Sequence, residues 1–108
     1  MKTLKFHPKL MESILDGSKT ITWRLFDDKD LRSGDHLEFI SSETNEKFVQ
    51  AEIVEVEEKQ ANRLTDDDLH AYGYRDRDHF FEINRKYYGD GVMENTLVKI
   101  IEFKIRET

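Results

Sequence analysis

The order of the periodic segments is the feature that most restricts the fold of this 108-residue chain. Three segments with the alternation and the β-branched or aromatic content of strands follow one another without a helix between them: 19–25, 36–40 and 48–58. A doubly wound α/β fold needs a helix between successive parallel strands, so this order argues against it. It predicts instead an α+β, mainly β fold, a small and mostly antiparallel β-barrel or curled sheet.

A short helix is predicted before these strands, over 7–17. Pro8 suits the first turn of a helix, where a missing N–H costs nothing. Gly17 can adopt the left-handed conformation that ends a helix.

Two further helices are predicted between the third strand and the last. The first follows Thr65, an expected N-cap, and carries three aspartates in its first turn, where they complement the helix dipole. The second covers 75–89, and its expected buried stripe comprises Phe80, Ile83 and Tyr87. A final strand is predicted over 96–107, and without any repeat or composition break we expect one domain over 1–108.

Charge narrows the range of ligands. The chain has 17 Lys and Arg against 23 Asp and Glu, a net charge of -6. Such a surface repels a long phosphate backbone unless its basic residues gather in one patch. A pocket for one nucleotide, one nucleoside or a short strand remains compatible with this charge.

Other classes of protein are disfavoured by composition. The chain has no Cys, which excludes disulfides and thiolate zinc sites, and its four His lack metal-ligand spacing. We therefore expect no metal and no other cofactor. No segment has the length and hydropathy of a membrane span, and we expect a monomeric, cytoplasmic protein.

The densest group of polar candidates lies where the first helix meets the first strand. Lys19 stands at this junction, and Thr22 and Arg24 share one face of the strand. Together, an ammonium, a hydroxyl and a guanidinium can hold a phosphate, a carboxylate or a carbonyl oxygen. Alternatively, Thr22 attacks an acyl carbon while a deprotonated Lys19 removes its proton. A third interpretation places the two cations on a solvated edge.

Aromatic and acidic residues form a second group of candidates. Tyr72 and Tyr74 flank Gly73 in a predicted loop and are the tyrosines freest to stack on a base. Trp23 is expected in the core. Asp68 could act as a general acid or base, although its place in a first helical turn predicts capping.

The motifs resemble the ASCH domain, a relative of the PUA RNA-binding domain. The segments ILDGSKTITWR (14–24) and RSGDHLEFI (32–40) resemble its pattern of a short helix, Gly-x-Lys, a strand ending in Arg, and Gly-Asp before the next strand. Residues 64–89 resemble its aromatic-rich helical insert, and VKIIEFKI (98–105) resembles its last barrel strand. Nearly the whole chain is covered.

This resemblance implies a PUA-like barrel whose cleft, lined by Lys19 and Arg24, binds RNA or a nucleotide-like ligand. One small bacterial branch consists of amidohydrolases that deacetylate N4-acetylcytidine, with a catalytic Lys and Thr at the spacing of Lys19 and Thr22; other members are described as ribonucleases. That branch also carries a Glu in the insert, where an ungapped placement puts Tyr72, and Asp68 is the candidate replacement. Binding of RNA or a modified nucleoside is the first hypothesis, amide hydrolysis the second, and an interaction module without a ligand the third.

Overall fold

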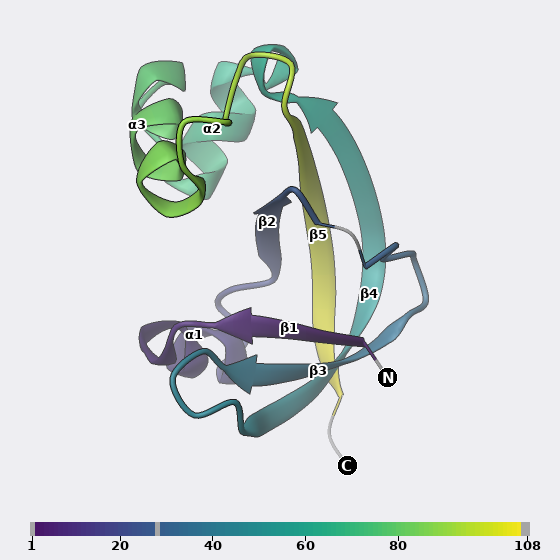
Figure 1. Ribbon diagram of the computed structural model, residues 1–108. Helices are drawn as coiled ribbons and strands as arrows, with labels where there is room; N and C mark the ends of the chain where they lie inside the picture. Colours follow the sequence, from purple (N-terminus) through teal and green to yellow (C-terminus); the bar gives the residue numbers. More distant parts are fainter. Residues whose placement is uncertain (1, 28, 107–108) are drawn as a thin grey trace. The chain divides into compact units, whose positions relative to one another are not determined.

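The computed structural model describes residues 2–27 and 29–106. Its helices and strands, in chain order, are β1 (Lys2–Phe6), the 3-10 helix η1 (Pro8–Leu10), α1 (Met11–Leu15), β2 (Ile21–Leu25), β3 (His36–Ser41), β4 (Lys47–Gln60), the 3-10 helix η2 (Ala61–Arg63), α2 (Asp66–Tyr72), α3 (Arg77–Tyr88) and β5 (Leu97–Arg106) (Figure 1). These strands form a mixed sheet in the order β1-β3-β4-β5-β2. The predicted α+β, mainly β fold class and the order of the predicted elements are confirmed.

The chain divides into two compact units. Among the described residues, unit 1 comprises 2–22, 29–56 and 101–106, and unit 2 comprises 23–27 and 57–100. The long strands β4 and β5 contribute residues to both units. The single domain over 1–108 stays a prediction, and residue 107, placed at the end of the last strand, lies outside the described residues.

Unit 1 contains a strand that the sequence analysis missed. β1 pairs in parallel with β3, with Leu4 opposite Phe39, while β3 pairs antiparallel with β4. Leu4 and Phe6 alternate with polar residues, which is the strand signal, but the segment is short and lies directly before a helix. The buried core of this unit comprises Leu4, Phe6, Ile14, Leu31, Leu37, Phe39, Ala51, Ile53, Ile101 and Phe103.

The first helical segment is shorter than predicted and begins as a 3-10 turn. The His7 side chain caps it by accepting a hydrogen bond from the Lys9 N–H at 3.1 Å, and Pro8 occupies its first turn. Gly17 has a φ of +84°, which confirms the left-handed residue predicted at its end.

Unit 2 is built around α2 and α3, which pack against each other (Figure 1). Thr65 caps α2 as predicted, and Gly73, with a φ of +101°, ends it. The buried core of this unit comprises Trp23, Leu25, Ala61, Leu64, Leu69, Phe80, Phe81, Val92 and Val98.

The predicted buried stripe of α3 is wrong in two of its three residues. Phe80 is buried, but Ile83 is exposed and Tyr87 is 78% exposed. The buried face instead comprises Phe80, Phe81 and Asn84. Asn84 tolerates burial because its amide donates hydrogen bonds to the Phe80 carbonyl at 2.9 Å and to a tyrosine hydroxyl. A polar residue on the inner face is what the hydrophobic pattern could not indicate.

The capping box of α2 leads to a test. The Asp68 N–H donates to the Thr65 hydroxyl at 3.0 Å, and the Thr65 N–H donates to the Asp68 carboxylate at 3.0 Å. Thr65→Ala leaves the first of these donors without its acceptor, so we expect the free energy of unfolding in urea to fall by about 1 kcal/mol. Thr65→Ser should retain most of the wild-type stability. Equal stability of Thr65→Ala and the wild type would contradict the capping role.

Candidate functional site

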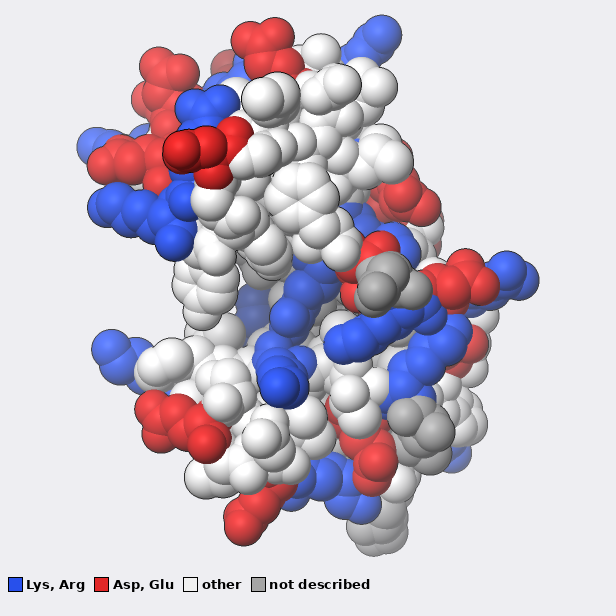
Figure 2. Space-filling model, in the orientation of Figure 1, with Lys and Arg blue, Asp and Glu red and all other residues white. Residues whose placement is uncertain are grey.

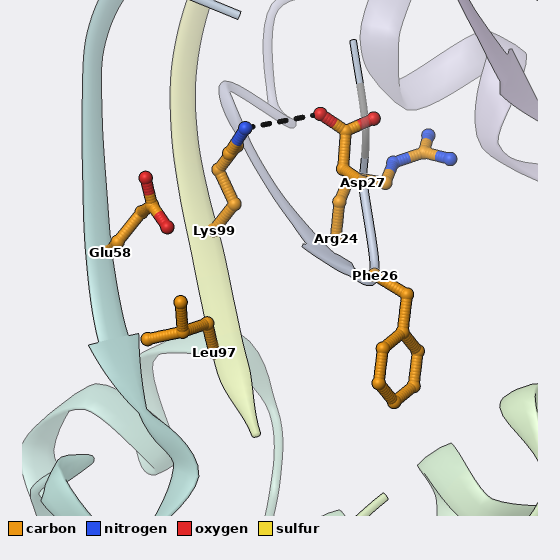
Figure 3. A pocket seen from close by; sticks show the side chains of 6 residues that line it. All are labelled: Arg24, Phe26, Asp27, Glu58, Leu97 and Lys99. Carbon is orange, nitrogen blue, oxygen red and sulfur yellow. Dashed lines mark hydrogen bonds and ion pairs between the residues drawn. The ribbon is translucent and has the colours of Figure 1, made fainter. Parts of the chain in front are cut away.

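A pocket of about 270 Å³ opens in unit 2 beside the end of β2 (Figure 3). Side chains from β2 and the residues after it, from β4 and from β5 line it. They are Arg24, Phe26, Asp27, Glu58, Leu97 and Lys99. The pocket therefore combines two cations, two carboxylates and two apolar side chains.

An almost buried ion pair lies in the wall of the pocket. Lys99 Nζ donates to Asp27 Oδ2 at 3.2 Å, and the two side chains are 12% and 8% exposed (Figure 3). Each side chain supplies the counter-charge that its partner needs away from water. The pair attaches the segment after β2 to β5 and presents a donor and an acceptor side by side.

Arg24 adds a second, partly desolvated cation. Burial lowers the pKa of the Arg24 guanidinium, and neighbouring groups, Tyr88 and Tyr72 first among them, oppose that shift. An arginine remains protonated at neutral pH even after such a shift, so the pocket wall keeps its positive charge. Its planar group suits bidentate contacts with oxygen acceptors on a ligand.

The two tyrosines predicted to stack on a ligand belong to an aromatic cluster in unit 2. Tyr72 is the last residue of α2, and its ring stacks on buried Trp23 at a centroid distance of 4.5 Å and an interplanar angle of 8°. The backbone N–H of Trp23 also donates to the Tyr72 hydroxyl at 3.1 Å. The ring centroids of Tyr74 and Tyr72 lie 5.8 Å apart. Burial raises the pKa of the Tyr74 hydroxyl, which accepts a hydrogen bond from Asn84.

Lys19 and Thr22 belong to unit 1. Lys19 Nζ donates to the Ile21 carbonyl at 2.9 Å, and the Lys19 N–H donates to the Ser13 carbonyl at 2.9 Å. Thr22 is only 3% exposed, whereas the preceding residue, Ile21, is exposed. The hydroxyl of Thr22 is thus part of a closed strand face in the structure.

Asp68, the candidate third acid, has a full set of structural contacts. Besides the capping box, its carboxylate accepts a hydrogen bond from Lys59 Nζ at 2.9 Å. Burial by itself would raise the pKa of Asp68, but the hydrogen bonds from Thr65 and Lys59 outweigh it and lower the pKa. These contacts hold the Asp68 carboxylate in its charged form, and its role in the structure is to cap α2.

Sequence reasoning found Arg24 but missed the rest of the pocket. Phe26 and Asp27 open a polar, acidic connection, and an aromatic residue in such a run was an available signal. Lys99 and Leu97 lie two residues apart on one strand face, which alternation indicates, but no pattern in the sequence ties that face to Asp27.

Across 2–27 and 29–106, no group of three or more His, Asp or Glu residues is placed to hold a metal ion. Among the helices in these ranges, none has the length and apolar content that crossing a membrane requires.

The fold, a mixed sheet with helices between β4 and β5, is similar to that of solved ASCH domain structures. An ASCH domain from Lactobacillus crispatus superposes with a TM-score of 0.66 at 17% identity, covering 96% of this chain and 79% of that one. A mutant of ZmASCH from Zymomonas mobilis gives 0.63 at 15% identity, covering 94% and 67%. Protein EF3133 from Enterococcus faecalis, of the family model DUF984, gives 0.71 at 14% identity, covering 98% and 76%.

These likenesses establish an ASCH-like fold, as the sequence motifs implied. At such identities they concern the fold alone. No family model and no curated protein matches the sequence.

The ion pair in the pocket wall leads to a second test. Asp27→Asn leaves the Lys99 ammonium almost buried without its counter-charge, so we expect a loss of about 3 kcal/mol in the free energy of unfolding. The control is Asp30→Asn, which breaks the exposed Asp30–Arg32 pair at 3.0 Å and should cost about 0–1 kcal/mol. Urea unfolding measures both. Similar small losses would show that the Asp27–Lys99 pair contributes no more than a surface pair.

Proposed function

We propose that the pocket of unit 2 binds a single nucleoside or nucleotide unit, free or within RNA. The observation that carries this proposal is the combination, in one small pocket, of hydrogen-bond donors, hydrogen-bond acceptors and apolar walls. Its volume of about 270 Å³ lies just below the roughly 300–1,000 Å³ of typical ligand pockets and suits a small ligand.

The polar groups match the edge of a base. Base edges present donors and acceptors next to one another. The Asp27–Lys99 pair presents an acceptor beside a donor, and Arg24 adds a planar set of donors. Leu97 and Phe26 supply apolar surface for the ring itself.

The charges favour one nucleoside unit over a long strand. Two cations and two carboxylates balance within the pocket, and the chain as a whole has a net charge of -6. Over the helices at the upper left of Figure 2, acidic and basic side chains are interspersed. A ligand that contributes at most one or two phosphates fits this pattern, because each phosphate held needs a local cation.

The ASCH-like fold supports the same conclusion. The sequence motifs resemble a relative of an RNA-binding domain, and the structure has the fold that these motifs imply. In that resemblance Arg24 lies at a cleft position, and Arg24 lines the observed pocket.

Calorimetric titration of the four ribonucleosides and their 5′-monophosphates tests the proposal. Arg24→Met keeps much of the apolar stem but removes the guanidinium, so we expect about a 10- to 100-fold loss of affinity. The matched control, Lys86→Met, removes an exposed cation of α3 outside the pocket and should bind like the wild type. No binding of any of the eight compounds at millimolar concentration, or an equal loss in both variants, would refute the assignment.

Amide hydrolysis by Lys19 and Thr22 is the second candidate. The hydroxyl that would have to attack belongs to a residue that is 3% exposed, and this burial is the reason for ranking binding first. The function would be deacylation of an N4-acetylcytidine-type nucleoside.

Incubation with N4-acetylcytidine, followed by chromatography, separates the two candidates. We expect no release of acetate by the wild type, because Thr22 is closed off from attack by a substrate. Turnover that disappears in both Lys19→Ala and Thr22→Ala would reverse the ranking and establish the hydrolase.

A further inference from the structure

Phe26 has a backbone conformation that its residue type disfavours. Its φ is +56°, in the left-handed region. Two other non-glycine residues among those described share a positive φ, Asp30 and Asn45, and both types tolerate it because their short polar side chains bond locally. A phenylalanine there is strained, because in the left-handed region its Cβ lies too close to the following carbonyl oxygen.

The side chain of Phe26 adds a second cost. It is 58% exposed, although burying such a ring is among the larger favourable contributions that one side chain can make. Its ring meets Tyr88 in an edge-type contact at a centroid distance of 5.9 Å and an interplanar angle of 67°, which leaves much of its surface open. Strain and exposure together place an open aromatic ring at the pocket.

The left-handed turn separates two neighbouring side chains. Asp27 points to Lys99 and closes the ion pair, while the Phe26 ring points away from that pair (Figure 3). Both side chains line the same pocket, Asp27 for polar contacts and Phe26 for apolar contacts.

We propose, on the basis of the function proposed above, that Phe26 is the stacking residue of this pocket and determines its specificity for a flat, unsaturated ring. The Phe26 ring contacts the face of the bound base while Asp27, Lys99 and Arg24 contact its edge. Stacking of a base on an aromatic side chain accounts for about 5- to 100-fold in affinity.

Three variants of Phe26 separate stacking from general apolar contact. Phe26→Tyr keeps the ring, Phe26→Leu keeps apolar bulk without a π-face, and Phe26→Asn removes both. In titrations with the four ribonucleosides we expect wild-type affinity for the first and a loss of at least about 5-fold for the other two. Met93→Asn, which replaces another exposed apolar residue of unit 2 outside the pocket, should bind like the wild type.

Thermal unfolding supplies a readout of opposite sign. Phe26→Asn relieves the backbone strain, so we expect its Tm to rise by about 2–8 °C while its affinity falls. A residue with a merely structural role would lose stability together with affinity, and a lower Tm for Phe26→Asn would overturn the argument.

The outcomes distinguish the two proposals. If the wild type binds a nucleoside and both Phe26→Leu and Phe26→Asn bind it with the same affinity, the stacking role is refuted and the proposed function stands. Failure of the wild type to bind any of the four refutes the function, and the stacking role with it.

Discussion

The ion pair between Asp27 and Lys99 fixes the geometry of the pocket in unit 2. It joins residues 72 positions apart in the sequence and attaches the segment after β2 to β5. Because both charges are almost withdrawn from water, neither can move away without leaving the other uncompensated. Arg24 and Phe26, on the same segment as Asp27, line the same pocket.

Aromatic packing gives each unit its own rigid support. In unit 1, Phe39 lies against Phe6 and Phe103 at centroid distances of 4.6 and 4.9 Å. In unit 2, the ring of Trp23 stacks on Tyr72, and Trp23 lies in β2 directly before Arg24, which lines the pocket. Trp23, the residue before Arg24, is held by the stacking of its ring and by the hydrogen bond of its backbone N–H, both to Tyr72. The Arg24 side chain therefore extends from a well-anchored part of β2.

The sequence predicted those parts of the structure that depend on residues close together along the chain. The Thr65 cap and the glycine end of the first helix are set within one turn of chain, and the sequence alone was enough to place them. The stripe of α3 was predicted wrongly because the burial of Asn84 depends on a tyrosine ten residues away. The pocket depends on the pairing of β4 with β5 and on a contact between Asp27 and Lys99, and neither has a local signature.

β2 is an edge strand of the sheet, and edge strands carry backbone groups that another chain can pair with. The Trp23 N–H, midway along β2, is bonded to the Tyr72 hydroxyl, which belongs to the end of a helix. A side chain thus takes the place that a further strand would need, and the tyrosine protects the sheet from growing at this edge. At the opposite edge, β1 carries Lys5 and also Lys2, whose ammonium pairs with Asp35 at 2.9 Å, and lysines on an edge strand oppose strand addition by a different means.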